Sequence, residues 1–196
     1  MPLIRKPDAA APAPETASDL AGASADARWA AARAMTAPGD VDALAKALSH
    51  EQNPRVREAI LTSLARIGTR QSAGAVAPLI ASDDAQLRAG ALDALRAMPG
   101  AVAELLPALL TDADADVRLL ACELARVIPE GAATAMMCDL LDRETEVNVC
   151  ASAIEVLTEV GSPEALPALE RCATRFADPF LTFSARVAAE RIGGRR

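Results

Sequence analysis

The sequence predicts an all-α protein, an α-solenoid of about six short helical hairpins in a right-handed superhelix. Three observations lead to this fold: a recurring unit, an apolar stripe in each unit, and a breaker after each stripe. Every unit opens on an apolar residue, and successive openers lie 29, 31, 30, 32 and 32 residues apart. The openers are Ala27, Val56, Leu87, Val117, Val149 and Leu181. Self-similarity at a fixed period of this size is typical of solenoids.

The first half of each unit has the pattern of an amphipathic helix. In the second unit, Val56, Ile60, Leu64 and Ile67 recur at i, i+4, i+8 and i+11, which places them on one helical face. The alternation of period two that marks a strand does not extend over any useful length. A glycine or proline ends the helical pattern of each unit. These breakers are Pro38, Gly68, Pro99, Pro129, Gly161 and Gly193.

The second half of each unit predicts a second helix. Another apolar run follows the first five breakers, in residues 41–48, 75–81, 102–110, 132–141 and 165–173. No unit can bury its own stripe, so the units must stack, each touching only its neighbours. The chain is 52% hydrophobic but has only 3 Phe, 1 Trp and no Tyr. This composition predicts an elongated core of small aliphatic side chains.

Residues 1–18 differ in composition from the rest of the chain. Pro2, Pro7, Pro12 and Pro14 interrupt an alanine-rich stretch without an apolar period, which predicts a flexible tail. The repeat domain is expected over residues 19–196. No apolar run has the length of a secretory signal or of a membrane span. We therefore expect a cytoplasmic protein that does not bind a membrane.

The units resemble HEAT-like repeats in their short bacterial form. Three first helices carry the resemblance, with Asn-Pro-Arg-Val-Arg-Glu-Ala-Ile at 53–60 and related sequences at 84–91 and 114–121. Prolines at 78, 107 and 167 in the second helices add to it. The resemblance covers roughly residues 19–193 and implies a scaffold or adaptor that binds other proteins. Tetratricopeptide repeats have a similar period, but their aromatic positions are missing here.

The resemblance also implies a ladder of arginines that links neighbouring units. An arginine follows the opener in the first four units, at Arg28, Arg57, Arg88 and Arg118. HEAT-like repeats place it against a loop carboxylate, and the candidate partners are Asp83, Asp84, Asp114 and Asp116. In the last two units the position holds Cys150 and Thr182, which predicts a C-terminal half held together by packing alone.

The residue types that support catalysis or metal binding are scarce. His50 is the only histidine, and the four cysteines form no Cys-x-x-Cys pair, so we expect no metal, no cofactor and no catalytic residues. The cysteines, at 122, 138, 150 and 172, are predicted to be buried free thiols. With 20 basic against 27 acidic residues, the chain lacks the charge that nucleic-acid binding requires. The alternative is a bilin-lyase-like auxiliary enzyme or chromophore-protein chaperone, because those proteins look similar in their short HEAT-like repeats.

The negative charge is concentrated in one quarter of the chain. Residues 101–150 hold 10 acidic and 3 basic residues, which accounts for the net charge of −7 of the whole chain. In HEAT-like solenoids the second helices line the concave face and the turns between units form a ridge beside it. We therefore predict that the concave face and an acidic ridge beside it bind a partner protein with a basic surface. The alternative is a solvated acidic face that only aids solubility. The predicted residues of the ridge are Asp112, Asp114, Asp116, Asp139, Asp142, Glu144 and Glu146.

All three phenylalanines lie close together near the C-terminal end. Phe176, Phe180 and Phe183 have the spacing i, i+4, i+7 of one helical face, although Pro179 favours a break there. One interpretation is that the rings cover the end of the core, as Trp29 would at the other end. The other is an exposed aromatic patch that binds a partner or forms a dimer.

Overall fold

The computed structural model describes residues 18–176 and 178–194, and within them the chain is entirely helical. The first helices of the units are α1 (Ala25–Ala34), α3 (Pro54–Ile67), α5 (Ala85–Arg96), α7 (Ala115–Leu124), α9 (Val147–Val160) and α11 (Pro179–Gly193). The second helices are α2 (Val41–Leu48), α4 (Arg70–Val76), α6 (Pro99–Leu109), α8 (Glu130–Arg143) and α10 (Leu166–Arg175). Five short 3-10 helices join them: η1 (Ser18–Ala21), η2 (Pro38–Asp40), η3 (Ala77–Ala81), η4 (Ala125–Val127) and η5 (Pro163–Ala165).

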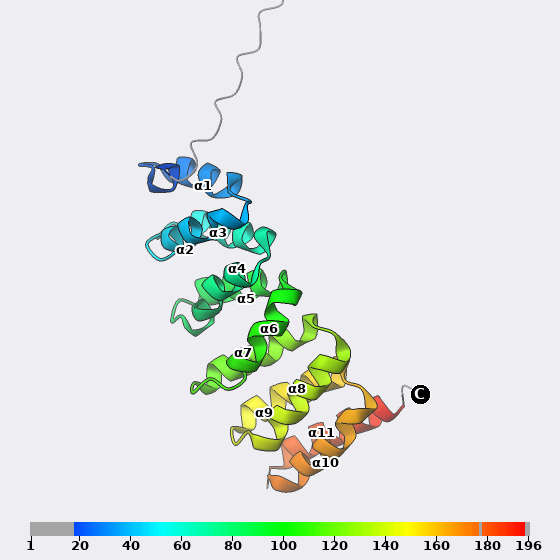
Figure 1. Cartoon of the computed structure of the whole chain (residues 1–196). Helices are drawn as coiled ribbons and strands as arrows, with labels where there is room; N and C mark the ends of the chain where they lie inside the picture. The colour runs from blue at the N-terminus through cyan, green and yellow to red at the C-terminus, as the bar shows by residue number, and fades with distance from the viewer. Residues whose placement is uncertain (1–17, 177, 195–196) are drawn as a thin grey trace, which may run out of the picture.

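The helices stack as an elongated array, from α1 at one end to α11 at the other (Figure 1). The first helices form one row, in which each contacts the next from α1 to α11. The second helices pack beside them. The predicted all-α solenoid is confirmed, with five hairpins and one final first helix among the described residues. The tail predicted for residues 1–18 lies outside them, except for Ser18, which begins η1.

The residue three positions before each opener immediately precedes a first helix and occupies its N-cap position. Five of these six residues cap the helix, because their side chains accept hydrogen bonds from backbone N–H groups of the first turn. These five residues are Ser24, Asn53, Asp84, Asp114 and Asp178, whereas Glu146, which precedes α9, makes no such bond. Gly68 ends α3 in a left-handed conformation with φ of 65°, which favours glycine.

The core is one continuous cluster of aliphatic side chains that runs through all units. Openers such as Val56 and Val149 are buried, as are the stripe residues Ile60, Leu64 and Leu157. Small residues, mostly alanine, fill the space between the helices, so neighbouring layers lie close together. No helix in residues 18–176 or 178–194 has both the length and the apolar character needed to cross a bilayer.

The outermost layer, α11, differs from the others at one repeat position. The residue five positions after the opener is buried in the first five units, where it is Ala32, Leu61, Leu92, Cys122 and Ile154. In α11 the equivalent residue is Arg186, which is exposed.

Candidate functional site

The arginines after the openers make the same backbone contact in each of the first four units. Each donates a hydrogen bond to the carbonyl oxygen six residues earlier. The bonds are Arg28 to Gly22 at 3.0 Å, Arg57 to Glu51 at 2.6 Å, Arg88 to Ser82 at 2.6 Å and Arg118 to Asp112 at 2.8 Å. We call these residues and their partners the arginine ladder. The contact fixes the turn before each first helix onto that helix.

Three of the four arginines also reach the turn of the next unit. Arg28 pairs with Glu51 at 2.7 Å, Arg57 with Asp84 at 2.8 Å and Arg118 with Glu144 at 2.7 Å. Of the predicted partners, only Asp84 is correct. Asp114 instead caps α7. The ladder is therefore a set of links between units, as the resemblance implied, but with different carboxylates.

Glu51 and Glu144 occupy equivalent places, five residues before the openers of the second and fifth units. Each carboxylate accepts two bonds from an arginine and two from the backbone N–H groups of the following two residues. The side chain of Glu144 is only 4% exposed. This role was not among the predictions from the sequence, although glutamate recurs at one fixed distance before an opener.

The hydrogen bonds hold both glutamates in the charged form. For Glu51, the hydrogen bond from Arg28 lowers the pKa from its ordinary value of 4.5 to about 2, against the opposing effect of burial. For Glu144, burial raises the pKa, but hydrogen bonds from Arg118 and from two backbone N–H groups outweigh it and lower the pKa to about 2. Both carboxylates therefore stabilise the folded protein as charged groups.

The ladder is incomplete at Arg88. The residue equivalent to Glu51 and Glu144 in the next turn is Asp112, whose side chain is one methylene shorter. Asp112 instead accepts a hydrogen bond from the backbone N–H of Asp114 at 2.9 Å. Among the described residues, Arg88 has no carboxylate within ion-pair distance. A hollow of about 290 Å³ lies here, lined by Arg88, Asp114 and Asp116 among others.

The prediction that the C-terminal half is held by packing alone is wrong. Cys150 takes the arginine position in α9, and Arg175 at the end of α10 supplies the guanidinium from another helix. Arg175 donates to the carbonyl oxygens of Asp142 at 2.7 Å and Glu144 at 2.6 Å. The turn between α8 and α9 is therefore held by polar contacts from both sides.

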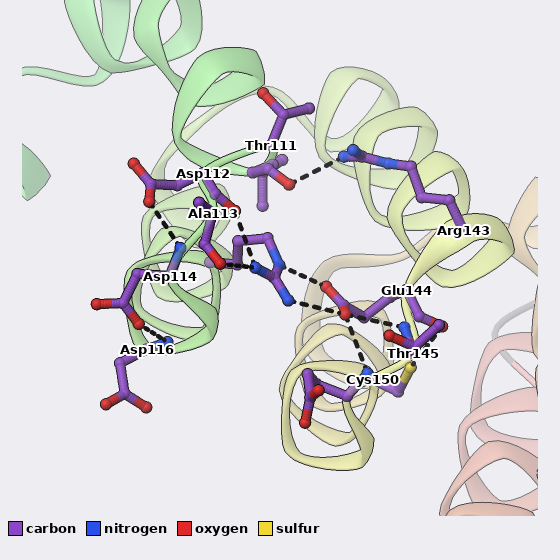
Figure 2. Close-up of polar contacts among 12 residues, drawn as sticks. Thr111, Asp112, Ala113, Asp114, Asp116, Arg143, Glu144, Thr145 and Cys150 are labelled. Atoms are coloured by element: carbon purple, nitrogen blue, oxygen red, sulfur yellow. Dashed lines mark hydrogen bonds and ion pairs between the residues drawn. The ribbon is translucent and has the colours of Figure 1, made fainter.

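The predicted acidic ridge divides into exposed and buried members. Glu144 is wrong as a partner-binding residue, since it is buried against Arg118. In Figure 2, Asp114 and Asp116 point away from Glu144, and both are exposed. Asp142 is exposed but pairs with Arg171 at 2.8 Å. We define the acidic ridge by its exposed members: Asp112, Asp114, Asp116, Asp139, Asp142 and Glu146.

The three phenylalanines do not share one face. Because α11 begins at Pro179, Phe176 lies before the helix, where it is half-buried against the core with Arg175 over its ring. Phe180 and Phe183 are 64% and 57% exposed, so they do not cover the end of the core. Trp29, at the position of Phe183 in the first unit, is half-buried beneath Arg33 and Arg55.

The cysteines are free thiols, as predicted, and three of the four are buried. Cys138 is partly exposed. Burial raises the pKa of the Cys122 thiol to about 12, which disfavours its reactive thiolate.

Stacked hairpins linked by an arginine ladder define this molecule as an α-solenoid repeat protein. The family model described as HEAT repeats matches residues 14–96 and 102–190, so the chain belongs to the HEAT repeat family. A search of curated proteins finds no match.

Several solved structures have a similar fold at low sequence identity. The archaeal HEAT-like repeats protein from Thermococcus onnurineus NA1 has a TM-score of 0.51 at 16% identity, covering 91% of this chain and 85% of its own. A designed armadillo repeat protein has a TM-score of 0.41 at 16% identity, covering 90% and 98%. The complex of CpcE and CpcF of phycocyanin lyase from Nostoc sp. PCC7120 has a TM-score of 0.40 at 12% identity, covering 96% and 99%.

Proposed function

We propose that this HEAT repeat protein is a non-enzymatic scaffold or adaptor that binds a basic surface of a partner protein through the acidic ridge. HEAT repeats generally mediate interactions between proteins. The proposal that the ridge is the binding site is supported by the excess of negative charge on it. Of its six carboxylates, Asp142 is paired with an arginine, while Arg118 nearby is already neutralised by Glu144.

The ridge has the physical properties of a docking surface for cations. Asp112, Asp114 and Asp116 lie at one turn, and Asp139 and Glu146 lie at the end of α8 and the turn after it. Carboxylates of one sign on adjacent turns produce a field that steers an oppositely charged partner and raises its association rate. Salt screens such a field over a Debye length of about 8 Å at physiological ionic strength.

The test begins with capture and identification of a stoichiometric protein partner from the native cell. Its affinity is then measured by calorimetry for wild type and for the variant Asp116→Asn/Asp139→Asn/Glu146→Gln, which we call the ridge variant. The proposal expects Kd to rise about tenfold or more, because several rim charges act together. The matched control, Glu58→Gln/Glu130→Gln/Glu170→Gln, removes the same charge from exposed sites outside the ridge and is expected to bind like wild type.

Equal affinity in the ridge variant and the wild type would exclude the ridge as the binding site. The same capture experiment addresses the alternative. A coloured tetrapyrrole adduct in place of a protein partner would indicate a bilin-lyase-like auxiliary enzyme.

A further inference from the structure

Only three large hydrophobic side chains are exposed among residues 18–176 and 178–194, and all three lie on α11, the outermost layer of the array (Figure 1). They are Phe180, Phe183 and Val187, with exposed fractions of 64%, 57% and 39%. Their spacing of i, i+3, i+7 places them on one side of the helix, which we call the α11 stripe. The opposite side, which includes Leu181 and Ala188, is buried in the core.

The repeat does not require an apolar stripe at these positions. At the positions equivalent to Phe180 and Val187, the five preceding first helices carry only polar residues. The position of Phe180 holds Asp26, Arg55, Gln86, Asp116 and Asn148, and that of Val187 holds Arg33, Thr62, Asp93, Glu123 and Glu155. An exposed apolar stripe that the core of the solenoid does not need marks an interaction surface.

The α11 stripe forms one wall of a groove on the first-helix face of the solenoid. The groove has a volume of about 730 Å³, and Leu119 of α7 and Ala151 of α9 contribute apolar atoms to its lining. Two packed helices lie about 8–10 Å apart, axis to axis. A helix that packs along the stripe therefore enters the mouth of this groove.

The order of residues along the stripe makes it complementary to itself. In two antiparallel copies of α11 related by a two-fold axis at the height of Ala185, residues at matching distances before and after Ala185 face each other. Phe183 then lies against Val187 of the second copy, and Phe180 lies against Arg191 of the second copy. Each contact occurs twice, which is the pattern of an isologous interface.

Phe180 and Arg191 also match in charge, because the negative face of an aromatic ring attracts a guanidinium. The protein already uses this contact between units, since Arg55 of α3 lies 4.4 Å from the centre of the Trp29 ring in α1. Arg191 is exposed, and no carboxylate of the described residues lies within ion-pair distance of it. Within one helix, Phe180 and Arg191 lie about 16 Å apart at 1.5 Å per residue, so they can meet only between two copies.

The exposed area sets the strength expected of such a contact. An aromatic side chain buries about 150–250 Å² in full, so two rings that are more than half exposed, with Val187, offer on the order of 300 Å² per copy. A specific interface buries about 800 Å² per partner, and the polar residues that flank the stripe supply the remainder. Transient interfaces lie at the lower end of this range. We therefore expect a Kd in the micromolar range.

We propose that the α11 stripe binds the same stripe of a second copy of this chain, so that two antiparallel α11 helices form a two-fold symmetric dimer. Phe183 and Val187 form the apolar centre of the interface, and Phe180 and Arg191 close it at both ends. The interface shares no residue with the acidic ridge, so dimerisation does not depend on the ridge.

Sedimentation equilibrium of the full chain tests the dimer, at physiological ionic strength and at concentrations from about 1 to about 300 µM, which bracket a micromolar Kd. Wild type is expected to show a monomer–dimer equilibrium. Phe180→Ala/Phe183→Ala, which we call the phenylalanine variant, is expected to raise the dimer Kd at least about tenfold, because buried aromatic anchors dominate such interfaces.

The antiparallel register is tested by mixing two variants. Phe183→Lys alone and Val187→Glu alone each place two charges against apolar side chains of the second copy, so each is expected to dimerise weakly. In the mixed dimer, the new lysine faces the new glutamate, and the remaining Val187 faces the remaining Phe183. We therefore expect the mixture to dimerise at least about threefold more tightly than either variant alone, the typical effect of one exposed ion pair.

Two controls separate this interface from other causes of association. Trp29→Ala removes the ring at the repeat position of Phe183 in the first unit, and the ridge variant removes three charges elsewhere; both are expected to dimerise like wild type. The melting temperature of the phenylalanine variant is expected to stay unchanged, because both rings are exposed. Should that variant unfold, Val187→Ser provides the same test.

Three results would overturn the proposal. The first is a wild type that stays monomeric over the whole concentration range, which would mean that the stripe binds a different protein. The second is a dimer that the phenylalanine variant leaves unchanged, since the two copies would then meet elsewhere. The third is a mixture of Phe183→Lys and Val187→Glu that dimerises no more tightly than the separate variants.

Discussion

Glutamate and aspartate are not interchangeable at the position five residues before an opener. Glu51 and Glu144 are long enough to accept hydrogen bonds from their own turn and from the arginine of the preceding unit at the same time. Asp112 bonds only within its turn, and Arg88 is left with the carbonyl of Ser82. At this position, one methylene group therefore distinguishes the two glutamates, which pair with a ladder arginine, from Asp112, which does not.

This comparison predicts a stabilising substitution. Asp112→Glu is expected to reach Arg88, keep the bonds within its own turn and raise the free energy of unfolding by about 1 kcal/mol, a typical net contribution of one hydrogen bond. Urea unfolding followed by circular dichroism measures the change. Asp116→Glu, which lengthens an exposed neighbour by the same group, serves as control. A loss of stability in Asp112→Glu, or an equal gain in the control, would refute the missing link.

The two ladder glutamates also predict how stability depends on pH. Their pKa values of about 2 in the folded protein lie below the ordinary value of 4.5, so the unfolded chain binds protons more readily than the folded one. Their contribution is complete above about pH 5 and is lost as the pH falls toward 2. Urea unfolding at a series of pH values is expected to show this decline. In Glu51→Gln/Glu144→Gln the decline between pH 5 and 2 is expected to be smaller; an unchanged decline would contradict the assignment.

At the scale of helices, the C-terminal units differ in which helix supplies the arginine that holds the turn between units. The ladder arginine is absent from α9, and Arg175 of α10 instead bonds the turn between α8 and α9 through its carbonyl groups. Cys150, in the ladder position, lies 3.9 Å from both the Glu144 carbonyl and Arg175. The turn thus keeps a cationic donor, although it comes from a different helix.

Removing that donor is expected to destabilise the C-terminal units. Arg175→Ala leaves two carbonyl groups without their hydrogen-bond partner and is expected to cost about 1 kcal/mol. Hydrogen exchange is expected to increase mainly in α9 and α10, because solenoid units unfold with their neighbours. Arg191→Ala removes an exposed arginine nearby and serves as control. Exchange rates in Arg175→Ala equal to those in the control would mean that packing alone holds these units.

The sequence predicted the helices well, because each carries a long apolar stripe bounded by glycine or proline. It did not predict which carboxylates join the ladder. The aspartates before the openers, such as Asp84 and Asp114, cap the helices, and that local role competes with pairing across units. The hydrogen bonds that Arg175 donates could not be predicted, because the carbonyl oxygens that accept them, of Asp142 and Glu144, lie 33 and 31 residues earlier in the chain. Likewise, the spacing of Phe176 and Phe180 suggested one face, but Pro179 separates them.

At the scale of the whole molecule, a thin and continuous core leaves much of the surface free for partners. The net charge of −7 resides in residues 101–150, where one glutamate of the predicted ridge is used for stability and six carboxylates stay exposed. Phe180 and Phe183 are exposed on α11, in the units that follow. The exposed carboxylates and the exposed rings therefore both lie in the C-terminal half of the solenoid.

The salt dependence of partner binding tests most directly whether the acidic ridge is the binding site. The Kd of the identified partner is measured by calorimetry at rising sodium chloride for wild type, the ridge variant and its matched control. Salt is expected to weaken binding steeply in wild type and in the control, and much less in the ridge variant, because the charges that salt screens are already absent there. The same salt dependence in all three proteins would contradict binding through the acidic ridge.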